Sequence, residues 1–477
     1  MKQQPYHEGK GELNQILIDY HNLKAGKKHR FLDEESFIII IDHFDEIENQ
    51  SEALLAAEIG LGQYPYSSEL MFRKADLLIS SKKYIEALDL LDVAALYDGK
   101  NISYFILKTD ALLALDRQPE AVELLQSALA YFDGEEKVDL LFDLADVYDD
   151  YEEFDKVFEC LKVILEEEHN NEEALYKICF WTDFTGRYEE AIILHQKIID
   201  ESPYNEIAWF NLGTAYQGLK LYEKAIDAYQ FAIVIEEKFD YAYRNMGDAY
   251  LRLRKYKEAI EVLEKVLELS RPEDVIYEAL GHCHHKLKNT AQARFNYKKA
   301  VHLNNEDARL HYKVANTYML DGQWQKAVKH LEDALRLNRN SREFNLAMGE
   351  CKTQLGLFKE AIVYFGTVVL HRPKNVSGWA ALLKCLIKAK MLDQANERCL
   401  VALHHTGQKP IIIYLYVAIL FAQNKNKEAL IQLENAMAID SKHLKTLLEI
   451  NPNILQNNQV LDIIARYKSK KRNHKRK

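Results

Sequence analysis

Proline and glycine are scarce in this sequence, with 8 prolines and 18 glycines among 477 residues. Proline breaks helix interiors and glycine weakens them, so their scarcity favours long helices joined by short turns. A disordered chain, or an all-β chain with many turns, would contain more of both. With 48% hydrophobic and 28% charged residues, the composition is instead typical of an ordered globular protein.

Long apolar runs are also absent. No stretch of the sequence approaches the roughly 18 consecutive apolar residues that a membrane-spanning helix requires. The N-terminal sequence MKQQPYHEGKGELNQILIDYHNL has neither the apolar core nor the small-residue cleavage site of a secretory signal. We therefore expect a cytoplasmic protein without a transmembrane segment.

Cysteine patterns and catalytic motifs are missing as well. The six cysteines, at positions 160, 179, 283, 351, 385 and 399, form no CxxC pair, which argues against a zinc ribbon and a small disulfide framework. The sequence contains no GxxxxGK[ST], GxSxG or HExxH motif. We predict no enzymatic activity, no catalytic residue, no cofactor and no metal.

What the sequence does contain is a regular repeat. A small residue, alanine in eleven of twelve cases, recurs every 34 residues, with a single interval of 36. The positions are Ala53, Ala87, Ala121, Val157, Ala191, Ala225, Ala259, Ala293, Ala327, Ala361, Ala395 and Ala429. Chance does not produce such a series. Repeats of this length indicate units that stack on their neighbours, because one unit alone cannot bury its apolar face.

A second small position lies twelve residues before the alanine. Glycine, alanine or cysteine occupies it in most repeats: Ala75, Ala145, Cys179, Gly213, Gly247, Gly281, Ala315 and Gly349. Apolar residues four and seven places after the alanine continue a helical face. Two amphipathic helices that cross closely need small residues where they meet, so each repeat is predicted to be a helical hairpin. Gly186, Gly322 and Gly356 stand at equivalent places in the turn between the helices.

These residues resemble the tetratricopeptide repeat (TPR) family. The segment WFNLGTAYQGLKLYEKAIDAYQFAI matches its motif best, at these residues: Trp209, Leu212, Gly213, Tyr216, Ala225, Tyr229 and Ala232. Departures are Thr109 and Leu383 at the small position and Val157 at the alanine position. The N-terminal repeats also resemble uncharacterised bacterial multi-TPR proteins. The resemblance implies an all-α, right-handed superhelical solenoid of about twelve TPR units with capping helices.

The predicted organisation has four parts. Residues 1–33 form an N-terminal segment with a short capping helix, and residues 34–443 form the twelve-unit TPR array. Residues 444–467 form C-terminal capping helices, and residues 468–477 form a disordered basic tail. Six lysines and arginines characterise this tail: Lys470, Lys471, Arg472, Lys475, Arg476 and Lys477.

The TPR resemblance also implies where a partner binds. Members of this family bind extended or helical protein segments in a concave groove lined by the first helix of each unit. The positions of this sequence that match the groove positions are Phe72, Asp76, Asp110, Phe142, Asp146, Asp149, Tyr176, Phe180, Asp183, Phe210, Tyr241, Arg244, Asp248, Glu278, His282, Arg309, Tyr312 and Asn316. Aromatic residues beside carboxylates suit a partner with basic side chains and apolar anchors.

Charge is distributed unevenly along the chain. The net charge of −11 is the sum of three segments: 6 basic and 4 acidic residues at positions 1–33, 13 basic and 40 acidic at 34–205, and 43 basic and 29 acidic at 206–477. The acidic part favours a basic protein partner, although charge that only confers solubility is an alternative. The leading hypothesis is a protein-interaction scaffold or adaptor.

Other hypotheses remain at this stage. The basic tail suggests an RNA- or ribosome-associated factor, since phosphate binding depends on lysine and arginine. An accessory or regulatory subunit of an enzyme complex is a further alternative, and head-to-tail self-association would make a homo-oligomer.

Two more specific sites are disfavoured. The chaperone-tail adaptors of the TPR family clamp a carboxylate, but their two asparagines are replaced here by Asp248 and Ala279. Glu278, His282 and His285 share one helix face and have the spacing of a metal site. We favour a structural role there, because the adjacent His284 falls on a core position.

Overall fold

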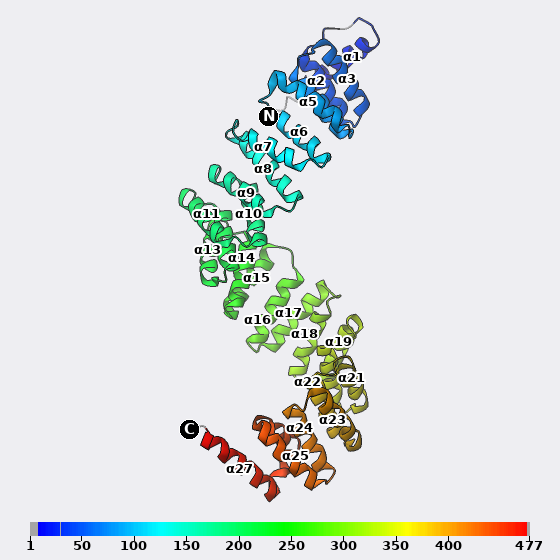
Figure 1. Ribbon diagram of the computed structural model, residues 1–477, viewed down its shortest axis with the longest axis vertical. Helices are drawn as coiled ribbons and strands as arrows, with labels where there is room; N and C mark the ends of the chain where they lie inside the picture. The colour runs from blue at the N-terminus through cyan, green and yellow to red at the C-terminus, as the bar shows by residue number, and fades with distance from the viewer. Residues whose placement is uncertain (1–7, 29, 475–477) are drawn as a thin grey trace. The chain divides into compact units, whose positions relative to one another are not determined.

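The computed structural model describes residues 8–28 and 30–474, and the side chains of residues 13–28 and 30–467 (Figure 1). Helices and turns, without a strand, make up these described ranges, so the predicted all-α class is confirmed. No helix in this part of the chain is long and apolar enough to cross a membrane.

The helices form twelve consecutive pairs, one for each predicted repeat. The first six pairs are α2 (Glu34–Glu46) with α3 (Gln50–Gln63), α4 (Ser68–Ser80) with α5 (Tyr84–Asp98), α6 (Ile102–Ala114) with α7 (Gln118–Ala128), α8 (Glu135–Asp150) with α9 (Phe154–Glu167), α10 (Glu172–Thr185) with α11 (Tyr188–Glu201), and α12 (Glu206–Gly218) with α13 (Tyr222–Ile235). The other six are α14 (Asp240–Arg252) with α15 (Tyr256–Leu269), α16 (Asp274–Lys286) with α17 (Thr290–Leu303), α18 (Ala308–Leu320) with α19 (Trp324–Leu337), α20 (Arg342–Gln354) with α21 (Phe358–His371), α22 (Val376–Lys388) with α23 (Leu392–Thr406), and α24 (Pro410–Ala422) with α25 (Asn426–Ile439). The repeat predicted from alanine spacing is therefore the structural unit.

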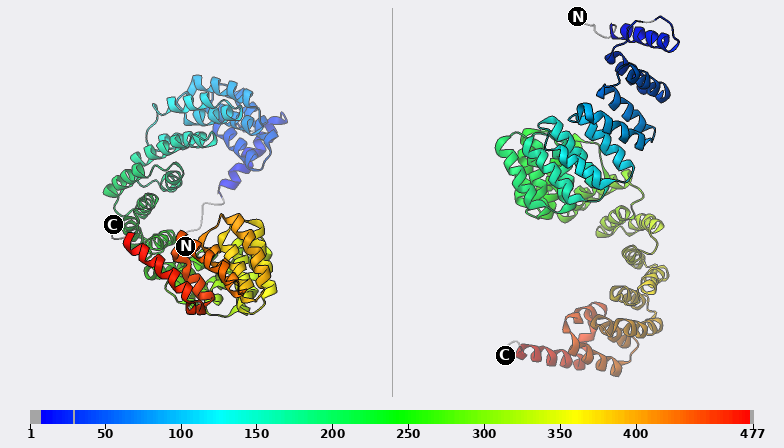
Figure 2. Two further views of the ribbon diagram at one scale, coloured as in Figure 1. Left: turned by 60° about the horizontal axis from the view of Figure 1, so that its bottom comes forward. Right: turned by 45° about the horizontal axis from the view of Figure 1, so that its top comes forward.

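The chain divides into two compact bodies. The N-terminal body contains residues 1–242 and the C-terminal body residues 243–477, with the division inside α14. Within each body, most helices pack against the next along the chain, and the further views in Figure 2 show the successive helical hairpins.

The ends of the repeat array carry additional helices. At the N-terminal end α1 (Glu8–Lys24) packs on α2, and its Tyr20 is fully buried there. The C-terminal end has η1 (Ser441–His443), α26 (Leu444–Ile450), η2 (Pro452–Gln456) and α27 (Asn458–His474). In Figure 1, α27 projects from the end of the C-terminal body. Its helical structure continues through 474, into the segment predicted to be a disordered tail, while residues 475–477 lie outside the described residues.

Where the two helices of a repeat cross, a small residue on the first helix faces a large side chain on the second. A Cβ atom added to Gly213 would lie 2.5 Å from the ring of Tyr229, which is itself fully buried. Gly281 and Gly349 approach the rings of Tyr297 and Phe365 equally closely. The alanine of the second helix is buried in every repeat, and Val157, which replaces it once, is buried too. The absent side chain on the first helix thus leaves room for a large one from the second.

The turns between paired helices share one backbone conformation. One residue per repeat has a positive φ, close to 60° or 70°, which stops the first helix. These residues are Glu48, Lys82, Asp116, Glu152, Gly186, Lys220, Arg254, Lys288, Gly322, Gly356, Lys390 and Asn424. The prediction that the three glycines stand at equivalent turn positions is confirmed.

Substituting Gly213 by alanine tests whether a small residue is needed opposite Tyr229. We expect Gly213→Ala to lower the free energy of unfolding by about 1–3 kcal/mol, because the new methyl group overlaps the ring of Tyr229. The double variant Gly213→Ala with Tyr229→Leu reproduces the Ala315 and Leu331 pair of another repeat and should recover part of the loss. Chemical denaturation of the full chain measures both effects.

A matched glycine provides the control for this experiment. Gly62 lies in α3, and a Cβ added there would meet no atom within 4 Å. Gly62→Ala should therefore leave stability unchanged or raise it by about 0.5–1 kcal/mol. Equal losses for Gly62→Ala and Gly213→Ala would contradict the packing argument.

Candidate partner-binding groove

Within the N-terminal body, the first helices of neighbouring repeats lie against one another. The helices α2, α4 and α6 contact in sequence, and so do α10 and α12, more extensively than the second helices α9 and α11. The closer spacing of the first helices places them on the inner side of the stack. Their outward-facing positions therefore form one continuous surface across several repeats.

A row of aspartates crosses this surface. Asp42, Asp76, Asp110 and Asp146 occupy one repeat position on α2, α4, α6 and α8, and Asp143 lies one turn before Asp146. We call these five residues the carboxylate row. They come from four successive first helices, so the stacking of the repeats is what lines them up.

The carboxylates of the row affect one another. Burial raises the pKa of Asp76, and the charges of Asp45 and Asp42 raise it further, against the opposing effect of Arg73. Burial raises the pKa of Asp110 too, followed by the charge of Asp76. Asp76 and Asp110 expose their tips to solvent and are still surrounded by protein atoms, a combination typical of side chains within a groove.

Asp143 is the most perturbed member of the carboxylate row. Burial raises its pKa to about 6, and the charges of Asp110, Asp146 and Asp139 contribute in the same direction. Its Oδ2 atom is buried and has no hydrogen-bond partner. A negative charge at this position is therefore costly in the free chain, and a nearby cation would relieve the cost.

Within the described part of the chain, ion pairs form only at the two ends of the row. Arg73 lies 3.5 Å from Asp42, and Lys177 lies 3.6 Å from Asp146. Both are shared with other carboxylates, because Arg73 also pairs with Glu69 and Lys177 with Glu173. Among the described residues, Asp76, Asp110 and Asp143 have no ion-pair partner. The middle of the row therefore retains uncompensated negative charge.

An aromatic patch continues the surface on α10. Tyr176, Phe180 and Phe184 lie one helical turn apart, and their exposed fractions are 57%, 60% and 58%. The rings of Phe180 and Phe184 stack with centroids 6.1 Å apart. Phe184 also meets Phe154 edge-on at 4.7 Å. Three exposed rings on a single helix face form the kind of apolar anchor site that protein interfaces use.

The patch extends toward the end of the N-terminal body. The ring of Phe210, on α12, lies 5.1 Å from that of Phe239, which in turn lies 6.5 Å from the ring of Tyr241. Tyr241 is 62% exposed. Asp183 lies beside the patch on α10, and burial raises its pKa. The surface thus passes from carboxylates to aromatic rings along the repeats.

Of the eleven groove residues predicted for the N-terminal body, the structure places ten at exposed or half-buried positions on first helices. Phe142 and Phe210 are half-buried, and Asp149 is exposed near the end of α8. Phe72 is a correction: it is 2% exposed and packs in a core cluster with Met71 and Leu91. Its position matches groove residues of other repeats, but here the ring points into the core.

The sequence prediction missed three carboxylates of this surface. Asp42 has the same repeat position as Asp76 and Asp110, so the 34-residue spacing could have found it. Asp45 stands one turn further along α2. Asp143 occupies a position filled by arginine, leucine and lysine in neighbouring repeats, so the repeat pattern contains no signal for it.

The groove residues predicted in the C-terminal body are mostly paired. Arg244 binds Glu273 at 2.6 Å, Asp248 lies 3.3 Å from Arg252, and Glu278 binds Lys313. Tyr312 packs against Phe344 at 5.2 Å. Arg309 is exposed, whereas His282 and Asn316 are half-buried. Internal pairing leaves this surface without the excess charge of the carboxylate row.

The same ion pairs bear on the two disfavoured sites. Both Arg244 and Lys313, which stand at clamp positions, are bound to glutamates, so they are not available together for a terminal carboxylate. Glu278 is bound to Lys313 and does not join His282 and His285 in a group of ligand atoms within the described ranges.

The cysteines lie in the core. Cys283, Cys351 and Cys385 are buried at one repeat position and form no disulfide. Burial raises the pKa of Cys283 to about 11 and that of Cys351 to about 12. Thiols with such pKa values are poor nucleophiles at neutral pH.

The family comparison agrees with this architecture. Three tetratricopeptide repeat family models match residues 204–272, 244–308 and 318–385. The chain contains tetratricopeptide repeats. No curated protein matches the whole sequence closely enough to be called a relative.

Several solved TPR structures align with this chain. YrrB, described as a TPR protein with an unusual peptide-binding site, is 19% identical with a TM-score of 0.36 over 39% of this chain and 95% of its own. The C-terminal part of a TPR repeat-containing protein from Cytophaga hutchinsonii is 15% identical, with a TM-score of 0.44, over 53% of this chain and 98% of its own. One chain of the APC/C hetero-tetramer Cut9-Hcn1 is 14% identical, with a TM-score of 0.35, over 86% of this chain and 99% of its own.

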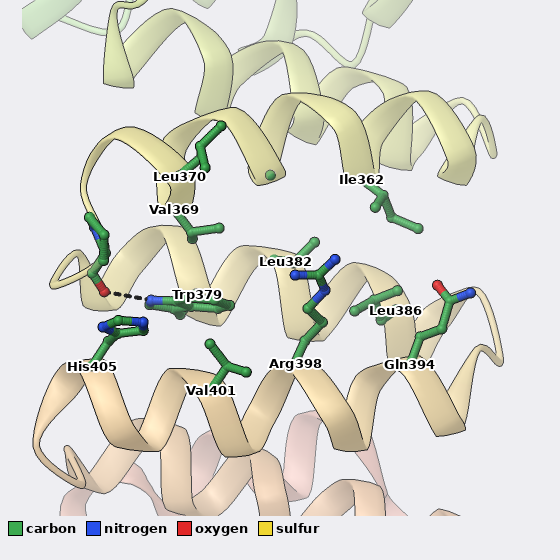
Figure 3. A pocket seen from close by; sticks show the side chains of 12 residues that line it. Ile362, Val369, Leu370, Trp379, Leu382, Leu386, Gln394, Arg398, Val401 and His405 are labelled. Carbon is green, nitrogen blue, oxygen red and sulfur yellow. Dashed lines mark hydrogen bonds between the residues drawn. The ribbon is translucent and has the colours of Figure 1, made fainter.

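The C-terminal body contains an apolar cavity that is lined mainly by second helices. Figure 3 shows a cavity of about 440 Å³ between the second helices α21 and α23, with α22 behind it. Leu370 and Val401 line it from the two sides, and Trp379 forms its floor and donates a 2.7 Å hydrogen bond to the carbonyl of Pro373. The sequence prediction did not include this cavity, because it considered only first-helix positions.

The predicted basic tail lies outside the described residues or their described side chains. Lys475, Arg476 and Lys477 lie beyond the described residues, and the side chains of Lys470, Lys471 and Arg472 lie beyond the described side chains.

Replacing Asp143 by asparagine tests whether its negative charge destabilises the free protein. A carboxylate whose pKa is raised by folding costs stability above that pKa, and the cost disappears as pH falls through it. We expect Asp143→Asn to raise the free energy of unfolding by about 1–2 kcal/mol at pH 7, after allowance for solvent screening. The gain should shrink as pH is lowered from 7 toward 4, which thermal denaturation across this range measures.

Asp133 is the matched control for this substitution. It is exposed in the loop before α8, so Asp133→Asn removes the same charge outside the groove. We expect no gain from this variant. A gain equal to that of Asp143→Asn would mean that net charge alone, and not the groove, determines the effect.

Proposed function

We propose that this TPR protein is a scaffold whose N-terminal body binds a basic segment of another protein, extended or helical, along the carboxylate row. Tetratricopeptide repeats are in general protein-interaction scaffolds, and they are generally not catalytic. The observation that carries the more specific proposal is the set of adjacent carboxylates with raised pKa values and no cation between them. A cationic partner supplies the missing charge.

The arrangement also suggests how the partner is oriented. Its lysine or arginine side chains would pair with Asp76, Asp110 and Asp143, and an apolar or cationic anchor would sit on Phe180 and Phe184. Cations bind aromatic faces as well as carboxylates, so a partner rich in arginine or lysine gains at both ends of the surface. We propose a cytoplasmic location, which suits the six free cysteines.

Charge reversal in the groove tests this function. The probe is a fluorescent synthetic helix of lysine and leucine, and its affinity for the full chain is measured by anisotropy. We expect Asp76→Lys with Asp110→Lys to weaken binding by more than about tenfold, because like charges then face one another. Binding to the unaltered protein should also weaken with added salt and as pH falls through the pKa of Asp143.

Two acidic residues on second helices of the same repeats provide the control. Asp89 on α5 and Glu123 on α7 are exposed, and reversing both gives the same net charge as the groove variant. We expect Asp89→Lys with Glu123→Lys to bind the probe within about twofold of the unaltered chain. Equal weakening by both variants would refute a groove site, since it would show attraction to overall charge.

A further inference from the structure

One repeat of the C-terminal body contains a group of potential metal ligands. His311 on α18 and His330 and Asp333 on α19 each offer one ligand atom, and these atoms all lie within 4.8 Å of one another. His330 and Asp333 are three residues apart, so they share the face of α19 that packs against α18. Within the described residues, no other group of histidine, cysteine and carboxylate side chains comes this close.

The tautomer of His311 follows from the other repeats. At the same repeat position, Trp209 donates from Nε1 to the carbonyl of Pro203 at 2.9 Å, and Trp379 donates to that of Pro373 at 2.7 Å. Asn345 donates in the same way to the carbonyl of Arg339. His311 places Nε2 3.0 Å from the carbonyl of Asn305, an acceptor only. Nε2 therefore carries the proton, and Nδ1 has a free lone pair.

That lone pair is buried and unsatisfied. His311 is 6% exposed, and its Nδ1 has no hydrogen-bond partner. It faces Oδ2 of Asp333 at a distance of 3.9 Å. The Nδ1 atom of His330 is also buried without a partner. A buried lone pair that faces a carboxylate oxygen without a donor is unfavourable, and a cation held between the three side chains would satisfy it.

The neighbouring charges leave the ligand atoms available. Arg336 binds the other oxygen of Asp333, Oδ1, at 2.9 Å, and its own side chain is mostly exposed. Burial lowers the pKa of His330, with the charges of Lys298 and His311 acting in the same direction and that of Asp333 against them. The ring stacks on Tyr318 at 5.7 Å, which holds its orientation.

The repeat fold itself does not require ligands here. Trp379, Arg398 and Val401 occupy the equivalent positions in another repeat, where they line the cavity of Figure 3. Those three side chains converge from α22 and α23, as His311, His330 and Asp333 do from α18 and α19. The repeat therefore brings three positions together, and in one repeat all three carry metal-binding groups.

We propose that His311, through Nδ1, His330 and Asp333 bind a divalent transition metal of the zinc class, with water completing the coordination. Two imidazoles and one carboxylate are a common donor set for such ions. The hydrogen bond from His311 to a carbonyl is the support that metal-bound histidines usually have. Donor atoms around tetrahedral zinc lie about 3.3 Å apart, so the side chains close by roughly 1 Å on binding. The metal fastens α18 to α19.

Zinc titration of the untagged full chain, after removal of metals, tests the site. Zinc is added in competition with a chromophoric chelator, and we expect one tightly bound equivalent. His311→Asn keeps a donor for the carbonyl, as Asn345 does, and Asp333→Asn keeps the shape of the side chain. Each should weaken zinc binding by at least about tenfold, whereas His302→Gln at an exposed position should not change it.

Two further measurements separate this site from others. Zinc should raise the thermal midpoint of the unaltered chain and not that of Asp333→Asn. Bound cobalt should give the visible bands of a tetrahedral site without thiolate charge transfer, because the cysteines are not ligands. Absence of a bound equivalent, or undiminished affinity in both His311→Asn and Asp333→Asn, would overturn the proposal.

Discussion

Each repeat depends on the close crossing of its two helices, where a small residue on the first helix admits a large one from the second. Gly213 with Tyr229 and Gly349 with Phe365 show this most clearly, since even one added methyl group would overlap the ring. Because most repeats meet this constraint, the helices repeat in register along each body. Residues at one repeat position then line up on neighbouring first helices, and the carboxylate row is a result of that alignment.

The same packing allows unfavourable features to persist on the surface. Asp76, Asp110 and Asp143 repel one another, and burial makes each of their charges more costly. The core of the repeats, which is independent of these side chains, provides the stability that offsets this cost. Residues that destabilise the free protein and remain exposed to a partner are typical of binding sites. Paired charges such as Arg244 with Glu273 show the alternative, in which compensation is internal.

The sequence predicted the helices and turns well because the repeat constrains size and backbone conformation at fixed positions. It predicted individual side chains less well. Leu383 departs from the small position, and in the repeat register it faces Cys399, so the sizes are exchanged between the helices and both residues are buried. Phe72 turned into the core where its counterparts are more exposed. The surroundings of Asp143 and the proximity of His311 to His330 and Asp333 result from contacts between helices. The position of a residue within its repeat does not reveal such contacts.

Hydrogen–deuterium exchange of the full chain, with and without the lysine–leucine helix, tests the central claim most directly. Bound probe should slow exchange in the first helices α4, α6 and α8, which carry the carboxylate row, and in α10 with its aromatic patch. Exchange in the second helices α5 and α7 of the same repeats should remain unchanged. Protection confined to the second helices, or binding without protection of α4, α6 and α8, would contradict the account.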